Sequence, residues 1–452
     1  MKMIKKLTAF ISAAAVAVSA IPAMTEIKAN AAGTKTAKQI TAEMGIGWNL
    51  GNSLDTNGTG ENSEQYWGNP AITKELIEFV HDQGFSSIRI PVTWGHHMDS
   101  SHKIDANYMK RVKEVVDYAY NDGMYVIINI HHDNEPNGTN YFYPDNAHLE
   151  MSETFVKSVW SQISETFKNY DQHLVFETLN EPRRVGDNST EWWFDVTNPP
   201  AVVQEAVSVI NTLNQDAVDV IRASGGNNKT RLIMCPGYDA SVDGATVDGF
   251  KKPNDSMVGV SIHAYSPYNF AMNTHDWEGA VSVYNDEMKS QLKSMFSTIK
   301  SKVIDKGYAC YIGEFGATNK NNDSERAKWA EDYTKQAKAL GIPVFLWDNN
   351  VYGSGDEMFG MIKRETLSVV YPEYFSSLMK AYKSSSTGRV PGDVNDDGEL
   401  NIKDVTLLKQ HLAKWNVTIN AKNADVDGDS QITIKDLTLI KQALAKWKVE
   451  LK

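Results

Sequence analysis

The stretch VFETLNEPR, residues 175–183, joins an apolar run to a polar cluster. The run has the composition of a buried strand, and Asn180, Glu181 and Arg183 follow where that strand must leave the core. A Glu at a strand end is usually a solvated loop residue. The role of Glu181 therefore depends on whether the chain supplies further strands of this kind, and a partner.

Eight such runs lie between residues 44 and 348, and helical stretches separate most of them. The runs are MGIGWNLG (44–51), SIRIPV (87–92), YVIINI (125–130), LVFETL (174–179), RLIMCPG (231–237), MVGVSIH (257–263), YACYIGEFG (308–316) and PVFLWD (343–348). The amphipathic stretches cover 73–83, 107–121, 202–222, 281–304 and 326–339. This alternation predicts an α/β protein with a (β/α)₈ TIM barrel. A doubly wound open sheet is the alternative, but no Gly-rich phosphate loop follows the first run.

The charge balance and the first residues indicate where the protein acts. The chain has 45 Lys and Arg against 57 Asp and Glu, and this net charge of -12 without a basic stripe argues against a nucleic-acid ligand. Three lysines precede an apolar stretch and the small-residue site Ala29-Asn30-Ala31, the layout of a signal peptide over 1–31. No later stretch is apolar enough to span a membrane. We expect a secreted protein without membrane insertion.

Polar side chains collect where the predicted strands end. They are Trp48, Asn49, Asn52, Arg89, Trp94, His96, His97, Asn129, His131, His132, Asp133, Asn180, Glu181, His263, Tyr265, Glu314, Trp347 and Asp348. In a TIM barrel the chemistry lies at the carboxyl ends of the strands. We therefore expect these side chains to share one rim.

Glu314, in YIGEFG, is the partner that Glu181 requires. Gly313 and Gly316 flank it and would let a substrate approach closely. Two carboxylates on one rim can divide the cleavage of a glycosidic bond, because one protonates the departing oxygen while the other attacks the anomeric carbon or activates water. An ion-pair or solvated role for each Glu is the alternative.

Residues 40–383 resemble a glycoside hydrolase of family 5, in its endoglucanase branch of subfamily 4 type, which also includes xyloglucan-active members. The motifs that carry the resemblance are GWNLGNSLD, WGNP, IRIPVTW, NIHHD, LNEPR, SIHAYSPYNF and IGEFGA. The resemblance implies that Glu181 is the acid/base and Glu314 the nucleophile of a retaining mechanism. It also implies supporting roles for Arg89, Tyr265, Asn180, His131, His263 and Trp347.

In that resemblance Arg89 and Tyr265 hydrogen-bond the nucleophile, and Asn180 holds the sugar 2-hydroxyl. His131 and His263 line the subsite and tune the acid, and Trp347 stacks under the sugar being cleaved. On physical grounds we expect Arg89 to lower the pKa of Glu314, and partial burial to raise the pKa of Glu181.

Other rim residues have simpler interpretations. The pairs His96-His97 and His131-His132 could suggest zinc, but neighbouring residues on a strand point to opposite faces, so we expect no catalytic metal. We expect several tryptophans to serve packing rather than sugar binding: Trp48, Trp67, Trp94, Trp192, Trp193 and Trp277. Cys235 and Cys310 are predicted to be two buried thiols, with a disulfide as the alternative.

A repeat follows the polar linker SSSTGRVP. The segment GDVNDDGELNIKDVTLLKQHLAKW from Gly392 recurs as ADVDGDSQITIKDLTLIKQALAKW from Ala424. Each copy places oxygen ligands at the spacing of a Ca²⁺ loop. The predicted ligands are Asp393, Asn395, Asp397, Glu399, Asn401 and Asp404 in the first copy and Asp425, Asp427, Asp429, Gln431, Thr433 and Asp436 in the second. Two features depart from an EF-hand: Asp replaces the last Glu, and Ser430 stands where Gly is usual.

The duplicated half-motif, in which neither loop has a convincing helix before it, resembles a type I dockerin of cellulosomal enzymes. That resemblance implies about two Ca²⁺ ions and a cohesin partner on a scaffold. The pairs Ile402-Lys403 and Ile434-Lys435 are identical between copies, so either helix could present the same face. The expected organisation is a signal peptide at 1–31, the barrel at 33–383, a linker at 384–391 and the dockerin at 392–450.

The sequence as a whole predicts a secreted, retaining endo-β-1,4-glucanase that acts on cellulose and related β-glucans without a catalytic cofactor. We expect a monomeric barrel held on an extracellular scaffold. One alternative is a hemicellulase of the same fold, acting on xyloglucan, mannan or xylan. Another is a catalytically inactive glycan-binding scaffold component, against which the presence of both Glu181 and Glu314 argues. Fold alone does not settle the substrate.

Overall fold

A closed barrel of eight parallel strands forms the larger part of the computed structural model, which describes residues 35–383, 391–395, 400–415 and 417–451. The strands are β1 (Ile46–Asn49), β2 (Ser87–Ile90), β3 (Tyr125–Asn129), β4 (Leu174–Glu177), β5 (Ile233–Pro236), β6 (Val258–His263), β7 (Ala309–Phe315) and β8 (Val344–Leu346). β1 pairs in parallel with both β2 and β8, which closes the sheet. The TIM barrel prediction is confirmed, and an open sheet is excluded. The predicted signal peptide lies outside the described residues.

Alternating residues divide each strand between the inside and the outside of the barrel. In β3, Val126 and Ile128 pack in the large outer core, whereas Ile127 belongs to a separate inner cluster. The inner cluster also contains Met44 of helix α1 (Ala37–Met44), which lies against the first residues of the strands. Because side chains alternate with a period of two, the next inward positions toward the strand ends are Arg89, Asn129 and Glu177. The fold therefore places a polar layer directly above an apolar one.

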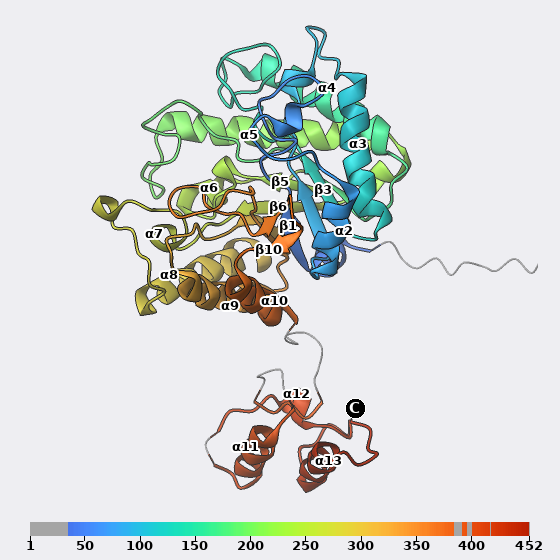
Figure 1. Cartoon of the computed structure of the whole chain (residues 1–452), viewed down its shortest axis with the longest axis vertical. Helices are drawn as coiled ribbons and strands as arrows, with labels where there is room; N and C mark the ends of the chain where they lie inside the picture. The colour runs from blue at the N-terminus through green and yellow to red at the C-terminus, as the bar shows by residue number, and fades with distance from the viewer. Residues whose placement is uncertain (1–34, 384–390, 396–399, 416, 452) are drawn as a thin grey trace, which may run out of the picture. The chain divides into compact units, whose positions relative to one another are not determined.

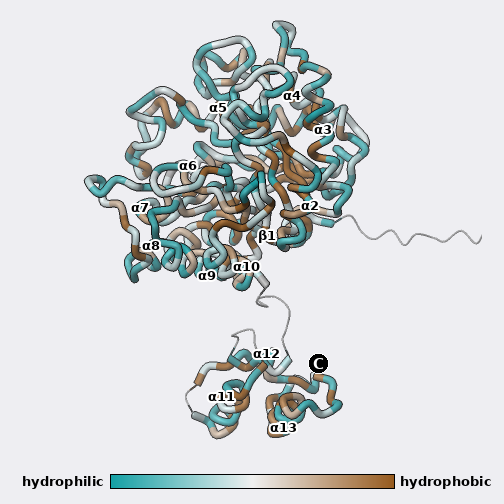
Figure 2. The backbone as a smooth tube through the Cα atoms, viewed as in Figure 1, coloured by the Kyte–Doolittle hydropathy of each residue, from teal (hydrophilic) through white to brown (hydrophobic). Residues whose placement is uncertain are grey.

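Amphipathic helices cover the outside of the barrel (Figure 1), and the hydropathy colouring shows hydrophobic strands inside more hydrophilic outer segments (Figure 2). The main helices are α2 (Lys74–Asp82), α3 (Ala106–Asn121), α4 (Leu149–Phe167), α5 (Ala201–Ala223), α8 (Asp286–Ile299), α9 (Asp323–Ala339) and α10 (Pro372–Lys383). Five match the predicted stretches. The stretch predicted from 281 begins at Asp286, because the Asn285 side chain accepts a hydrogen bond from the Met288 N–H and caps the helix there.

Helices α4 and α10 were not predicted. α4 buries one face with Phe155, Val159, Trp160 and Ile163, a spacing that is readable in the sequence. Cys235 and Cys310 are free and buried, which confirms the prediction of two thiols. Within the described residues, no helix combines the length and apolar character that a membrane crossing requires.

The repeated segment forms three short helices, α11 (Ile402–Leu412), α12 (Ala421–Ala424) and α13 (Ile434–Leu444). They enclose a small core of Val394, Val405, Leu408, Ala424, Val426, Leu437 and Ile440. Asn401 and Thr433 cap α11 and α13 through matching capping boxes with Asp404 and Asp436. The one-turn helix α12 precedes the second loop, where the sequence indicated no convincing helix. Most of the predicted linker lies outside the described residues.

Candidate active site

Arg89 is the centre of the polar layer. It is fully buried, and its guanidinium binds two carboxylates, Glu177 at 2.7 Å and Glu314 at 2.7 Å. The same group donates to Asn180 Oδ1 at 2.7 Å and to Asn49 Oδ1 at 3.0 Å. A buried cation requires such paired anions, since an unpaired charge in the core is strongly destabilising. Arg89 therefore sets the positions of four side chains from three strands or strand ends, those of β1, β4 and β7.

Glu177 is a site residue that the sequence analysis missed, although it lies inside the opening stretch. It accepts hydrogen bonds from Tyr311 Oη at 2.9 Å and Asn129 Nδ2 at 2.9 Å, as well as from Ser261 and Arg89. Burial raises the pKa of Glu177, but Arg89 and His263 lower it further, to about 2. A charged residue at an inward position of an otherwise apolar strand is the signal that could have revealed it.

Glu314 stands at the carboxyl end of β7 with both oxygens engaged. Arg89 Nη1 donates to Oε1 at 2.7 Å, and the Tyr265 hydroxyl donates to Oε2 at 2.8 Å. The Glu314 side chain is only 6% exposed. These two fixed donors hold the carboxylate in one orientation at the floor of the cleft.

Glu181 follows β4 and lies beside Glu314. Its Oε1 is 2.7 Å from His263 Nδ1, its Oε2 is 3.7 Å from the Arg183 guanidinium, and its side chain is 18% exposed. One oxygen of Glu181, one of Glu314 and a His263 nitrogen all lie within 4.8 Å of one another. Arg183 also lies over the Trp192 ring at 3.8 Å. The sequence alone predicted no role for Arg183.

The pKa order of the two carboxyls differs from the one expected. Burial lowers the pKa of His263, but Glu314, Glu177 and Glu181 raise it to about 9, so this residue is a cation. Burial raises the pKa of Glu181, yet His263 and Arg183 lower it below its ordinary value. Burial raises the pKa of Glu314 more than His263 and Arg89 lower it. The expectation was wrong because His263 pairs closely with Glu181, and because Arg89 is shared with Glu177.

The other predicted rim residues surround this pair. Asn180 is 4% exposed and bonds Arg89. His131 accepts a hydrogen bond at Nδ1 from Asn129 Nδ2 at 3.1 Å, because Asn129 Oδ1 is already bonded to the Val92 N–H. The rings of His131 and Trp347 are parallel, with centroids 6.0 Å apart. Trp347 is 7% exposed.

The geometric argument against a metal at His131-His132 was incomplete. Both residues follow β3 rather than lie within it, and their ring centroids are 4.4 Å apart. Ligand atoms of His131, His132 and the buried Asp55 lie within 4.8 Å of one another. Burial raises the pKa of Asp55 to about 6, whereas the His132 side chain is 41% exposed. Asp55, which was not predicted, already accepts two backbone N–H bonds from Asn52 and Ser53.

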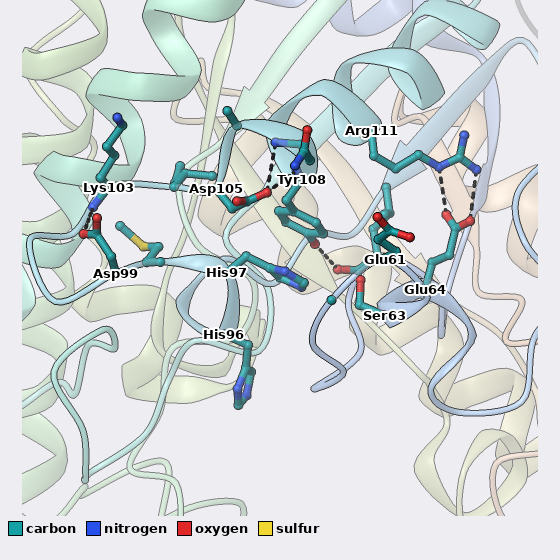
Figure 3. A pocket seen from close by; sticks show the side chains of 16 residues that line it. Glu61, Ser63, Glu64, His96, His97, Asp99, Lys103, Asp105, Tyr108 and Arg111 are labelled. Carbon is teal, nitrogen blue, oxygen red and sulfur yellow. Dashed lines mark hydrogen bonds and ion pairs between the residues drawn. The ribbon is translucent and has the colours of Figure 1, made fainter.

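His96 and His97 do not join the catalytic cluster. They follow β2 and line a separate cavity of about 790 Å³ (Figure 3). His97 stacks on Tyr108 with centroids 3.5 Å apart, and burial lowers the pKa of His97 to about 4. Within this cavity Arg111 pairs with Glu64 at 3.1 Å.

Two of the six tryptophans that were expected to pack are buried, and the other four are exposed. Trp48 and Trp94 are buried and bond Asp348 and the Asn129 carbonyl. Exposed side chains are instead found for Trp67, Trp192, Trp193 and Trp277, at 40%, 48%, 64% and 79%. Trp67, Trp192 and Trp193 lie in loops, and Trp277 lies in the short helix η5 (Asp276–Glu278). They are surfaces on which a ligand ring can stack.

Oxygen side chains gather in the second repeat. One oxygen each from Asp425, Asp427 and Asp429 lies within 4.8 Å of the others, and hard oxygen donors are the ligands of Ca²⁺. Asp404 and Asp436 are fully buried and accept backbone N–H groups, at 2.8 Å from Val394 and 2.9 Å from Val426. The remaining predicted residues that are described, Asp393, Asn395, Asn401, Gln431 and Thr433, lie in the same two loops. Asp397 and Glu399 lie outside the described residues.

Known proteins match both parts of the chain. Residues 51–353 match the model of cellulase (glycosyl hydrolase family 5), and residues 391–445 match the type I dockerin domain. Endoglucanase A of Clostridium longisporum is 41% identical over 79% of this chain and 68% of its own, and endoglucanase A of Ruminococcus albus is 43% identical over 73% and 88%.

Solved structures agree with these matches. A GH5-4 broad specificity endoglucanase from C. longisporum superposes with a TM-score of 0.72 at 40% identity, covering 78% of this chain and 99% of that one. A family 5 lichenase mutant from Caldicellulosiruptor sp. F32, in complex with cellotetraose, gives a TM-score of 0.72 at 40% identity over 78% and 96%. The chain therefore belongs to glycosyl hydrolase family 5 and carries a type I dockerin domain.

Proposed function

We propose that the chain is a retaining endo-β-1,4-glucanase in which Glu314 is the nucleophile and Glu181 the acid/base. The observation that supports this most directly is the separation of the two carboxylates, whose nearest oxygens lie within 4.8 Å. Retaining glycosidases place the pair about 5 Å apart, whereas inverting enzymes leave about 6.5–9.5 Å for a water molecule. The gap in this site is too short to place water between base and sugar.

The first step forms a covalent bond between the sugar and Glu314. A Glu314 oxygen attacks the anomeric carbon, the bond from that carbon to the leaving oxygen breaks, and Glu181 gives its proton to that oxygen. In the second step Glu181 takes a proton from water, the water oxygen bonds to the anomeric carbon, and the ester bond to Glu314 breaks. Arg89 and Tyr265 hold the Glu314 oxygens through both steps, at 2.7 and 2.8 Å.

Substrate binding supplies the pKa order that the mechanism requires. The Glu181 side chain is 18% exposed and that of Glu314 only 6%, so a sugar that covers the cleft removes water mainly from Glu181. Loss of water raises a carboxyl pKa. The pKa of Glu181 rises on binding, while Arg89, Tyr265 and the His263 cation keep Glu314 an anion.

Three residues would bind the sugar that is attacked. Arg89 occupies Asn180 Oδ1, so the Asn180 amide NH₂ remains to donate to a sugar hydroxyl. His131 accepts a bond at Nδ1, so its Nε2 carries the proton and can also donate. Trp347, whose ring is parallel to that of His131, supplies the apolar contact. His263, bonded to Glu181, tunes the acid.

The substrate is proposed to be an internal bond of cellulose or a related β-glucan. Exposed aromatic rings on several strand-end loops suit a long, unbranched sugar chain, and the similar proteins of known sequence are named endoglucanases. A hemicellulase of the same fold is the second candidate. The broad specificity of the similar C. longisporum structure is the observation that favours keeping it.

The C-terminal domain is proposed to hold about two Ca²⁺ ions and to bind a cohesin, since type I dockerins generally bind calcium. Asp425, Asp427 and Asp429 would supply hard oxygen ligands in the second loop. Catalysis itself needs no cofactor. We further propose that the barrel spans 33–383, is monomeric, and is exported by the 1–31 signal peptide to an extracellular scaffold such as a cellulosome, with a linker at 384–391 and the dockerin at 392–450.

Replacing Glu314 tests the proposed function. Glu314→Ala should lose at least about 10³-fold in rate on carboxymethylcellulose, because the attack itself is removed. Azide should restore turnover and give a product of inverted configuration. Wild-type-like activity in this variant would contradict the assignment.

Replacing Glu181 should give a different result. Glu181→Ala should keep much of the first step on 4-nitrophenyl β-cellobioside, since a good leaving group needs little protonation, while activity on cellulose falls by about 10²–10⁴-fold. Equal losses on both substrates would show that Glu181 is not the acid.

A further inference from the structure

Glu177 is a buried carboxylate that neither catalytic step uses. It lies at the carboxyl end of β4, in the same stretch as Glu181, and none of its surface is exposed. Substrate therefore cannot reach it. Burying a carboxylate is costly unless fixed donors replace the water that it loses. Any function of Glu177 in the reaction has to act through the groups that it binds.

The first of these groups is Arg89, which Glu177 holds by one edge. The Glu177 Oε2 accepts a hydrogen bond from Arg89 Nε at 2.8 Å and lies 2.7 Å from Arg89 Nη2. Contact with two nitrogens fixes the plane of the guanidinium. The third nitrogen, Nη1, is then directed at Glu314 Oε1, to which it donates at 2.7 Å. The orientation of Arg89 toward Glu314 therefore depends on Glu177.

Glu177 also lies against a second cation, His263. The Glu177 Oε1 is 3.8 Å from His263 Nε2, and the other ring nitrogen, Nδ1, lies 2.7 Å from Glu181 Oε1. Arg89 Nη2 is only 3.4 Å from the same His263 Nε2. Two cations at this distance repel each other, and an anion close to both offsets the repulsion. Glu177 therefore favours the charged form of His263 beside Glu181.

The remaining contacts hold Glu177 itself in place. Its Oε1 accepts hydrogen bonds from the Tyr311 hydroxyl at 2.9 Å and from Ser261, and its Oε2 accepts one from Asn129 Nδ2 at 2.9 Å. These three partners belong to β7, β6 and β3. Side chains on the strands of a barrel hold a group more precisely than side chains on loops. The position of the Glu177 charge is therefore fixed by the barrel itself.

We propose that Glu177 is a positioning residue, whose negative charge orients Arg89 and keeps His263 a cation. Through these two side chains it acts on both catalytic carboxyls, although it contacts neither the substrate nor the reacting atoms. The inference rests on the proposed function, because that function assigns Glu314 as the nucleophile and Glu181 as the acid/base. The charge of Glu177 is the same before and after each step, since no proton or bond is transferred to it.

The test variant is Glu177→Gln, which removes the charge and nearly keeps the shape. Its amide NH₂ can donate to the hydroxyls of Tyr311 and Ser261, which can accept as well as donate, while its carbonyl oxygen faces Arg89. On cellotetraose, kcat/KM at the optimum pH should fall by about 10- to 100-fold, because a hydrogen bond between two charged groups is replaced by a weaker one.

The pH profile of kcat/KM separates a positioning role from a merely structural one. Removing one negative charge lowers the pKa of every titratable group near it. The acid limb, which reports Glu314, and the alkaline limb, which reports the His263–Glu181 pair, should therefore both move to lower pH. With Glu177 only 3.8 Å from His263, the alkaline limb should move by at least about one pH unit. The variant keeps all the other charged or titratable groups that act on Glu177 or His263: Arg89, Tyr311, Glu181, Glu314, Asp239 and His131.

Two further variants separate charge from shape and from distance. Glu177→Asp keeps the charge on a shorter side chain, so kcat/KM should fall while both limbs stay at their wild-type pH. Glu43→Gln removes a carboxylate that also accepts a hydrogen bond from a tyrosine, Tyr125, at 2.6 Å. Tyr125 is the first residue of β3, at the opposite end of the barrel from the site, so this variant should change neither the limbs nor kcat/KM.

Limbs that stay at the wild-type pH in Glu177→Gln would overturn the inference, because Glu177 would then support only the fold. Limbs that move in Glu177→Asp, or that move equally in Glu43→Gln, would overturn it as well. The Glu177→Asp result applies even if the Gln variant does not fold. A wild-type protein without activity on cellotetraose would instead contradict the proposed function, so the two failures are distinguishable.

Discussion

The barrel and the repeated segment each gather carboxylates, but they neutralise them differently. In the barrel Glu177 and Glu314 are buried on either side of Arg89, and the His263 cation lies 2.7 Å from Glu181. In the second repeat, Asp425, Asp427 and Asp429 converge within 4.8 Å on one short loop. There the cation that pairs with Asp427 at 2.7 Å is Lys435, whose side chain is 68% exposed and therefore screened by solvent.

This difference predicts how each part depends on its surroundings. A buried cation from the chain itself is fixed by folding, so the barrel site needs no added ion to be stable. In the short acidic loop the pairing cation is exposed and screened, so metal binding contributes directly to the folding of this small domain. The barrel should therefore be sensitive to the loss of its buried cation, and the repeated segment to the removal of metal ions.

Removal of Arg89 should have the largest effect, and it should be confined to the barrel. Arg89→Met leaves Glu177 and Glu314 buried without their shared partner, so we expect a loss of about 3–5 kcal/mol in the free energy of unfolding. Activity should fall by at least about 10³-fold, because Glu314 is no longer held as an anion. Urea unfolding and hydrolysis assays on the full chain measure both.

The exposed pair Lys302–Asp248 supplies the matched control. Its atoms are 2.7 Å apart with side chains 39% and 47% exposed. Lys302→Met removes the same charge and should change stability by less than about 1 kcal/mol. If Arg89→Met changed the free energy of unfolding by a similarly small amount, the buried network would not be what stabilises the barrel site.

Chelation should affect the repeated segment alone. With EDTA, residues 392–450 should lose their cooperative thermal transition and their affinity for a cohesin, because the loop carboxylates repel one another without Ca²⁺. Hydrolysis of soluble β-glucan should be unchanged. Calorimetry on the full chain with and without EDTA measures this, with a chain ending at Ser384 as the control. If the thermal transition of the repeated segment did not change with EDTA, the calcium proposal would be contradicted. A loss of hydrolysis with EDTA would indicate a required metal in the barrel.

The barrel should lose stability in mild alkali. The pKa of His263 is raised to about 9 from 6.5, so its stabilising contribution is complete below pH 6.5 and disappears as the pH rises through about 9. This difference between the two pKa values corresponds to about 3 kcal/mol in the free energy of unfolding. Thermal unfolding between pH 6 and pH 10 should therefore show a steeper decline for wild type than for His263→Gln, which lacks the titrating ring. Parallel declines would mean that His263 is not charged in the folded state.

The smallest expected effect concerns Ser430. Its φ is 65°, the left-handed conformation that glycine adopts without cost. Ser430→Gly should stabilise the repeat by about 1 kcal/mol and tighten Ca²⁺ binding to the second loop. Lys446→Gly, at a φ of 58° after α13, is the control: it should stabilise the helix end without changing Ca²⁺ affinity. If Ser430→Gly and Lys446→Gly changed the Ca²⁺ affinity equally, the Ser430 turn would not influence the calcium loop specifically.

The architecture and the closeness of Glu181 and Glu314 were readable from the sequence because each depends on local pattern. The strand periods and the polar residues at strand ends predicted the barrel and brought Glu181 and Glu314 to one rim. Arg89 followed as a charge within an apolar strand. The duplicated loops predicted the C-terminal fold. They indicated that a helix follows each loop, but not that Asn401 and Thr433 cap those helices.

What was missed depends on contacts between distant segments. The pKa order of Glu181 and Glu314 could not be derived without knowing that Arg89 is shared with Glu177 and that His263 bonds Glu181. The exposure of Trp192 and Trp193 is a property of an uncovered loop, which composition does not reveal.

The configuration of the first product tests the central claim, that Glu181 and Glu314 act as a close pair in double displacement, most directly. Proton NMR of cellotetraose during the first minutes of hydrolysis distinguishes the two anomers before they interconvert. Because oxygens of the two carboxylates lie within 4.8 Å of each other, the β-anomer should form first and the α-anomer should appear only by later mutarotation. Initial formation of the α-anomer would show inversion and would contradict the assignment of Glu314 as a nucleophile.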